Sequence, residues 1–190
     1  MTERAFSAAT LPTRRLVLRP FEAGDAAEVH AVWHDQVYLE FAPVRFPHAQ
    51  ASLDRAVEWC ARKTEEQRAA GLGVGFAGEE RDSGRLACHV NLFDVDWDAM
   101  IAEIHYWTAA WARGNGYAAE AAGAVARWAL TEHGFARITL RTITGNAASQ
   151  KVARSAGFRF EGVLRNAAWS RAGRGDMAVY SLVPRDLVET

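Results

Sequence analysis

Residues 102–128 read AEIHYWTAAWARGNGYAAEAAGAVARW, and this stretch decides the fold. It starts within Ile101–Thr108, a short segment rich in β-branched and aromatic residues, which predicts a strand. A glycine-rich loop from Arg113 to Ala118 follows, and then an alanine-dense segment without proline that predicts a long helix. The loop therefore lies at a helix N-terminus, where unpaired N–H groups and the helix dipole favour an anion and Arg113 adds positive charge. These features predict a phosphate-bearing ligand.

The predicted strand places its side chains on two faces. Period-two alternation puts Glu103, His105 and Trp107 on one face, and Ile104, Tyr106 and Thr108 on the other. The face that carries Glu103 and His105 holds two groups that can accept a proton.

The glycine loop also satisfies a second phosphate-binding pattern. Gly114-x-Gly116-x-x-Ala119 matches the dinucleotide fingerprint, and Glu132 lies at a tolerable distance for a ribose contact. In that fold the first glycine follows its strand directly, whereas five residues separate Thr108 from Gly114 here. The preceding segments also indicate hairpin-linked strands, so a nicotinamide-dependent oxidoreductase ranks last. A solvated loop without a ligand is the third alternative.

A second informative stretch, residues 136–162, reads ARITLRTITGNAASQKVARSAGFRFEG. Its first part alternates as a strand does and ends at Gly145-Asn146. Asn146 is a favoured N-cap for the next helix, and Ser149, three residues on, points to the same side. Gly157 is placed to end that helix.

Together the two stretches resemble the GNAT superfamily of acyl-coenzyme A transferases. The resemblance lies first in the superfamily's Arg/Gln-x-x-Gly-x-Gly/Ala pyrophosphate loop, carried here by Arg113, Gly116 and Ala118. The downstream Asn-x-x-Ser…Gly-Phe-x-x-Glu-Gly pattern is similar to the branch of the ribosomal-protein N-terminal acetyltransferases RimJ and RimL; it lies at Asn146, Ser149, Gly157, Phe158, Glu161 and Gly162. Residues 13–20, 102–107 and 175–181 resemble the first, central and closing strands of that branch. The branch usually has Gly in place of His105, which predicts a differently shaped acceptor cleft.

The resemblance implies acetyl-CoA as the co-substrate and a set of residues that hold it. These are Tyr106, Trp107, Thr108, Arg113, Gly114, Asn115, Gly116, Tyr117, Ala118, Asn146, Ser149, Lys151 and Arg154. Backbone N–H groups at a break in the central strand near Trp107 and Thr108 are implied to polarise the acyl carbonyl. For several of these residues an ordinary role stays open: Asn146 as a cap, Ser149 as a first-turn helix residue, and Lys151 and Arg154 as solvated charges.

Glu103 is the preferred general base, because the resemblance places a catalytic carboxylate there, and His105 is the alternative. Ser149 is the candidate proton donor to the leaving thiolate. The segment 38–48 holds two prolines and three aromatic residues, which predicts an irregular loop. Together with Glu103, four aromatic residues are candidates for the acceptor site, and each is as readily a core residue: Trp33, Tyr38, Phe41 and Phe46.

The acceptor class follows from the energetics of deprotonation. An α-amine has a reference pKa near 7.7 and a lysine amine near 10.4, so deprotonating lysine costs roughly 3.7 kcal/mol more. Together with the resemblance to the RimJ/RimL branch, this difference favours a peptide N-terminus or small-molecule amine over a side-chain lysine. The function predicted is an acyl-CoA-dependent N-acyltransferase for acetyl or another short acyl group. A catalytically silent acyl-CoA-binding sensor is the alternative.

Composition sets the remaining bounds. With 190 residues, 49% hydrophobic and 24% charged, the chain fits one globular domain, and its net charge of −1 argues against general nucleic-acid binding. Two cysteines indicate no disulfide framework, and Cys88 is expected to be a buried hydrophobe. No signal peptide or long apolar run is visible, so we expect a cytoplasmic protein without membrane contact. The sequence does not decide between a monomer and a homodimer. Asp94, Asp96 and Asp98 lack the glycine and distal glutamate of a calcium loop, so no metal is expected.

The order of predicted elements gives the fold class. After a flexible tail over residues 1–10 come a strand, two helices, three antiparallel strands, a helix, a strand, a helix and two closing strands. The second helix covers residues 52–68, with Leu53, Val57 and Cys60 or Ala61 facing inward. This order predicts an α+β domain over residues 1–190 with a mixed central sheet of about six or seven strands flanked by helices.

Overall fold

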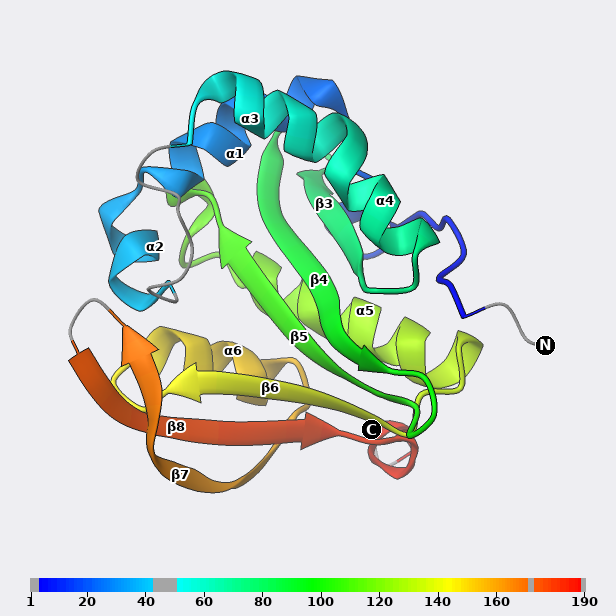
Figure 1. Cartoon of the computed structure of the whole chain (residues 1–190), viewed down its shortest axis with the longest axis vertical. Helices are drawn as coiled ribbons and strands as arrows, with labels where there is room; N and C mark the ends of the chain where they lie inside the picture. Colours follow the sequence, from blue (N-terminus) through cyan, green and yellow to red (C-terminus); the bar gives the residue numbers. More distant parts are fainter. Residues whose placement is uncertain (1–3, 43–50, 171–172, 189–190) are drawn as a thin grey trace.

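The computed structural model describes residues 4–42, 51–170 and 173–188. Its centre is one sheet with the strand order β1-β2-β3-β4-β5-β6-β8-β7 (Figure 1). The strands are β1 Leu11–Pro12, β2 Leu16–Arg19, β3 Val74–Glu80, β4 Leu86–Asp96, β5 Ile101–Thr108, β6 Arg137–Ile143, β7 Arg159–Ser170 and β8 Gly173–Leu182. Neighbours are antiparallel except for β5 and β6, which are parallel. The predicted α+β class and mixed sheet are confirmed, and the count of eight exceeds the prediction by the two-residue β1.

Helices cover both faces of the sheet. In Figure 1, α3 and α4 lie in front of the sheet with α1 beside them, and α5 and α6 lie behind it. The helices are α1 Ala26–Trp33, α2 Gln36–Phe41, α3 Leu53–Glu58, α4 Thr64–Ala69, α5 Tyr117–Glu132 and α6 Ala147–Ser155; a π-helical turn, η3 Trp59–Lys63, joins α3 to α4, and the 3-10 turns are η1 Ala23–Asp25, η4 Ala110–Ala112 and η5 Pro184–Leu187. Small residues let α5 pack closely: a Cβ on Gly123 would lie 3.4 Å from the carbonyl oxygen of Ala156 in the segment after α6.

Strands β5 and β6 stay together only at one end. Their parallel pairing joins Ile101 to Arg137, Ala102 to Ile138 and Glu103 to Thr139, and no further pair follows. Beyond Glu103, β5 continues alongside β4 while β6 continues alongside β8, so the two backbones diverge, as Figure 1 shows. The second half of β5, His105 to Thr108, therefore has no strand partner on its β6 side among the described residues.

The N-terminal segment is part of the core. Phe6 is only 1% exposed, and its ring stacks on Phe135 at 5.7 Å and lies 5.0 Å from Trp97. The prediction of a flexible tail over residues 1–10 is therefore wrong for Phe6, because a single aromatic side chain can anchor a segment that shows no periodicity. Residues 1–3 lie outside the described part of the chain.

Two further predictions need correction. The segment 38–48 was expected to be irregular, but Tyr38 and Phe41 belong to α2, whose N-terminus is capped by the Asp35 side chain accepting from Tyr38 N at 3.0 Å; residues 43–50 are not described. In the predicted helix 52–68, Leu53 and Val57 are exposed. The buried positions on this segment are Ala56, Cys60 and Thr64, so the inward stripe runs through Ala56 in place of Leu53 and Val57, while Cys60 is buried as predicted; a π turn follows α3.

Candidate active site

The glycine loop leads directly into the N-terminus of α5. Gly114 and Gly116 both adopt left-handed conformations, with φ of +79° and +80°, which other residues rarely adopt. No atom would lie within 4 Å of a Cβ on Gly114, so the space above the backbone is open. Asn115, Tyr117 and Ala118 continue the loop into the first helical turn, where N–H groups have no intrahelical acceptor. The geometry fits the approach of a diphosphate to the backbone.

Two arginines lie at this loop, and their roles differ from those expected. The Arg113 guanidinium, predicted to face a phosphate, binds Asp35 at the start of α2, with Nη2 to Oδ1 at 2.5 Å. Arg15, which the sequence did not single out, donates to the carbonyl oxygen of Asn115 at 2.8 Å and lies over the Tyr117 ring. Its Nη2 would be 3.5 Å from a Cβ on Gly116. Arg15 is therefore the cation next to Asn115 and Gly116 of the loop, and it also forms an ion pair with Glu120.

Glu103 lies where β5 and β6 begin to diverge. Its carboxylate forms an ion pair with Arg141 of β6, and its side chain is only 13% exposed. Burial raises the pKa of Glu103, and the hydrogen bond and positive charge of Arg141 act in the opposite direction. The Glu103 carboxylate is thus mostly buried, is fixed in position by Arg141, and lies beside the point where β5 and β6 diverge.

His105 lies two residues further along the same face. Its Nδ1 is 3.3 Å from Oδ1 of Asn91, the residue opposite it on β4. Behind it lies His89, whose ring centroid is 6.3 Å from that of His105 and 5.4 Å from that of Trp107. The predicted common face of Glu103, His105 and Trp107 is consistent with this arrangement, and the Trp107 side chain is buried.

Tyr106 points to the opposite face and meets α6. Its hydroxyl lies 2.7 Å from Ser149 Oγ and also donates to the Ser149 carbonyl oxygen at 3.2 Å. Burial raises the pKa of Tyr106 to about 12, so the hydroxyl stays protonated. Asn146 caps α6, accepting from Ser149 N at 3.0 Å, as its residue type predicts. The structure thus brings Tyr106 and Ser149 together next to the diverging strands.

The remaining predicted cofactor residues are Thr108 at the end of β5 and Lys151 and Arg154 on α6. Thr108 ends β5 opposite Cys88 of β4, and the β4–β5 register runs without interruption from Glu103 to Thr108. The expected break in the strand is therefore not a bulge near Trp107; unpaired backbone arises because β6 diverges. Lys151 is exposed on α6, and Arg154 donates to the Tyr180 hydroxyl at 3.1 Å.

The predicted acceptor residues divide into two groups. Trp33 is a core residue, 5% exposed, with its ring 5.8 Å from that of Trp59. Tyr38 and Phe41 are half-buried on α2, which the Asp35–Arg113 pair ties to the glycine loop. Phe46 lies outside the described residues. Of the four aromatic candidates, Tyr38 and Phe41 stay candidates for an acceptor wall.

Several residues of the site were missed by sequence reasoning: Arg15, Asp35, His89, Asn91 and Arg141. Asp35 precedes a helix and could have been found as an N-cap. His89, Asn91 and Arg141 come together with the site through strand register, and Arg15 through its contacts with Asn115 and Glu120; spacing along the chain reveals neither.

The described residues give no support to a cysteine nucleophile, a metal site or a membrane-spanning helix. Cys88 is fully buried, and burial raises the pKa of its thiol to about 12, which suits a packing residue. Within the described ranges, no group of three or more His, Cys, Asp or Glu side chains is placed to hold a metal ion. No helix there is long and apolar enough to span a bilayer.

Comparison with known proteins agrees with this geometry. Residues 15–159 match the family model of the acetyltransferase (GNAT) domain. The chain is 27% identical over 177 residues to the uncharacterized N-acetyltransferase YoaA of Bacillus subtilis (strain 168), across 93% of this chain and 98% of that protein. RimJ of Mycobacterium smegmatis in complex with CoA-disulfide superimposes with a TM-score of 0.83 at 22% identity, over 95% of this chain and 90% of that one. The ribosomal-protein-S5-alanine acetyltransferase of Vibrio fischeri gives 0.79 at 16% identity, over 92% and 96%. The resemblance to the RimJ/RimL branch is confirmed at the level of the fold.

Proposed function

The chain belongs to the GNAT acetyltransferase family and is an acetyl-CoA-dependent N-acetyltransferase, and from this premise we propose that it acetylates a primary amine by direct attack. The favoured acceptors are a peptide or protein N-terminus and a small-molecule amine, with Glu103 as general base and Ser149 as proton donor. The observation that carries the proposal is the placement of these two side chains on opposite faces of the sheet at the point where β5 and β6 diverge.

The co-substrate is held by elements on one side of that opening. Acetyl-CoA supplies the acetyl group as a thioester. The open backbone at Gly114–Gly116 and the first turn of α5 suit its diphosphate, with Arg15 as the nearby cation. Asn146, Ser149 and Tyr106 border the route from this loop to the diverging strands.

Base and acid on opposite faces suit direct transfer. The amine approaches from the Glu103 face, and the thiol leaves on the Ser149 face, so neither group needs to move past the other. Glu103 takes a proton from the incoming ammonium, directly or through a water, and its raised pKa makes it a better proton acceptor than a solvated carboxylate. Ser149 Oγ gives a proton to the departing thiolate and is reprotonated from solvent, and the Tyr106 hydroxyl holds the Ser149 oxygen in place.

Two matched peptides test the acceptor class. One carries a free α-amine and an acetylated lysine, and the other carries a blocked N-terminus and a free lysine. With acetyl-CoA near neutral pH, we expect kcat/KM to be at least about 100-fold higher for the α-amine, since deprotonating the lysine costs roughly 3.7 kcal/mol more than deprotonating the α-amine. Equal rates, or a preference for the lysine peptide, would refute the proposed acceptor class.

Paired substitutions identify the base. Glu103→Gln keeps the shape of the side chain but cannot take a proton, so turnover should fall by about 100-fold or more and recover partly at alkaline pH. If His105→Gln causes that loss and Glu103→Gln does not, His105 is the base. If the wild type binds coenzyme A but releases no thiol with any amine, the sensor alternative replaces the enzyme.

A further inference from the structure

His89 is a buried histidine that has no hydrogen-bond partner in the part of the chain that the structure describes. The residue lies on β4, is 5% exposed, and neither ring nitrogen has a partner among the described residues. Its ring is enclosed by those of Phe21 at 5.2 Å, Trp107 at 5.4 Å and Trp59 at 5.5 Å. Buried polar groups in folded proteins are nearly always paired, and a phenylalanine would satisfy this packing without the cost of an unpaired imidazole. The two nitrogens therefore indicate a partner that the folded chain does not supply.

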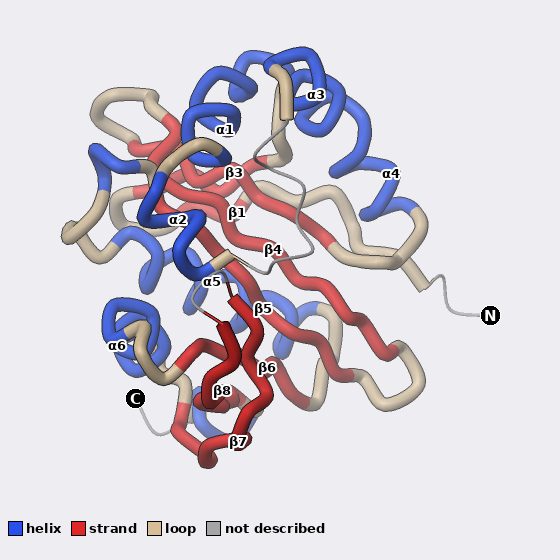
Figure 2. The backbone as a smooth tube through the Cα atoms, turned by 60° about the vertical axis from the view of Figure 1, so that its left-hand side comes forward, coloured by secondary structure: helices blue, strands red, loops and turns tan. Residues whose placement is uncertain are grey.

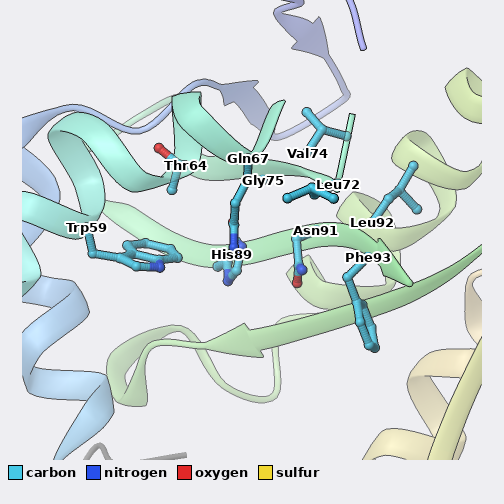
Figure 3. Close-up of a pocket in the computed structure, with 11 residues that line it drawn as sticks. Trp59, Thr64, Gln67, Leu72, Val74, Gly75, His89, Asn91, Leu92 and Phe93 are labelled. Carbon is cyan, nitrogen blue, oxygen red and sulfur yellow. The ribbon is translucent and has the colours of Figure 1, made fainter. Parts of the chain in front are cut away.

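A cavity of about 60 Å³ lies beside this ring, between the sheet and the covering helices. In Figure 3, His89, Asn91 and Phe93 project from β4 on one side, with Trp59 and Gln67 of the helical layer nearby. The volume is several times what one water needs, and the polar side chains in its wall are those of Thr64, Gln67, His89 and Asn91. No charged side chain is among its described lining residues.

Gly75 keeps the space in front of His89 open. This glycine lies inside β3 and has no positive φ, so its backbone would accept any residue. A Cβ there would lie 3.3 Å from His89 Nε2 and 3.8 Å from the Asn91 Cβ. A second cavity, of about 220 Å³, shares Gly75 and Thr64 with the first and is lined by Cys60 and Ala61 of the π turn. Such π turns occur frequently at functional sites.

The cavity adjoins the reacting centre through Asn91. The Asn91 side chain lines the cavity and also contacts His105, while Phe93 lies opposite Glu103 in the β4–β5 register. Figure 2 shows β4 and β5 running side by side, with α3 and α4 above β3 and β4. A molecule in the cavity would thus lie on the same face of the sheet as the proposed base.

We propose that this cavity holds the non-reacting end of the acceptor amine and selects an uncharged group that both donates and accepts a hydrogen bond, namely a hydroxyl or a primary carboxamide. This inference rests on the proposed function. A neutral imidazole offers one N–H and one lone pair on opposite edges of its ring, and a group that both donates and accepts can bond to whichever nitrogen faces the cavity, in either tautomer. Burial, and then the charge of His105, lower the pKa of His89 well below its usual value, so the ring stays neutral. An ammonium or a carboxylate would enter without an opposite charge to pair with.

Matched acceptors test the selection. Two pairs of short peptide amides differ at the N-terminal residue, threonine against valine and asparagine against leucine, so that each pair is close in shape. With acetyl-CoA, the wild type should prefer the polar member in kcat/KM by about tenfold or more, because the apolar member leaves His89 unpaired. His89→Phe should reduce the ratio to near one, and Gly75→Ala should reduce it by filling the space at Nε2. His133→Phe, at a histidine packed between Phe6 and Trp128, is the matched control and should keep the wild-type ratio.

The contrary outcomes are distinct. Equal kcat/KM within both pairs for the wild type, or an equal loss for both members in His89→Phe, would overturn the selection while leaving the acetyltransferase intact. If no amine is acetylated, the proposed function fails, and the cavity is then tested by binding alone. Threonine amide at millimolar concentration should shift the ring ¹⁵N resonances of His89, and unchanged resonances would overturn the cavity proposal.

Discussion

At the scale of single residues, the Glu103 carboxyl is subject to two opposing effects. Burial raises its pKa and Arg141 lowers it. Arg141→Met removes the lowering effect, so the pKa of Glu103 should rise further. A general base works only when deprotonated, and the acidic limb of the kcat/KM profile should therefore move to higher pH. A limb that stays in place or moves to lower pH would show that Glu103 is not the titrating base.

The contact between Tyr106 and Ser149 predicts coupled effects on turnover. Ser149→Ala should lower kcat by about 100-fold with little change in the dissociation constant for coenzyme A, since a proton donor acts mainly in the transition state. Tyr106→Phe should lower kcat less, and the double variant should be no slower than Ser149→Ala, because the two hydroxyls act as a unit. Additive losses in steady-state assays would mean that the residues act independently.

Sequence patterns identified individual residues better than their partners. Period-two alternation placed Glu103 and His105 on one face, and residue type identified Asn146 as a cap. Arg141, Asn91 and His89 reach the site only through the pairing of β4, β5 and β6. Because strand register depends on the whole sheet, no local pattern shows that Arg141 is the partner of Glu103.

At the scale of elements, the loop before α5 offers a matched experiment. Gly116→Trp should abolish the rise in melting temperature caused by coenzyme A, because the side chain blocks approach to the backbone. Gly134→Trp is the control, since Gly134 has a similar φ of +71° and open space at the other end of α5. It should lose a similar amount of stability yet keep the rise, which at a hundredfold excess over the dissociation constant corresponds to about 2.7 kcal/mol. If both variants lose the rise in melting temperature caused by coenzyme A, the proposal that coenzyme A binds at this loop is contradicted.

The elements that sequence predicted well are those with long, regular patterns. The strands β3, β4 and β5 and the helices α5 and α6 follow their apolar periodicity and their glycine or asparagine boundaries. The helix α2 was missed because aromatic residues and nearby prolines conceal a six-residue helix. The predicted inward stripe of the helix over residues 52–68 was wrong at Leu53 and Val57, because the buried positions are Ala56, Cys60 and Thr64.

At the scale of the whole molecule, the N-terminal segment closes the core. Phe6→Ala should lower the free energy of unfolding by about 3–5 kcal/mol, the cost of removing a fully buried aromatic side chain. Val188→Ala, at a side chain that is 86% exposed, is the control and should change it by less than about 0.5 kcal/mol. Chemical denaturation of both variants measures the difference. Similar values for the two would mean that the segment contributes nothing to the core.

The divergence of β5 and β6 is the feature of the whole molecule from which the function follows, and neither strand alone predicts it. Each has an ordinary strand pattern, and the opening exists only because β8 pairs with β6 where β5 does not.

The most direct test of the proposed chemistry is acetyl transfer itself. Purified protein is mixed with acetyl-CoA and a panel of peptide and small-molecule amines, and released thiol and acetylated amine are quantified together. We predict amine-dependent release with one thiol formed for each acetylated amine, and its loss in Glu103→Gln or, if His105 is the base, in His105→Gln. Binding of coenzyme A without amine-dependent thiol release across the panel would contradict the proposal.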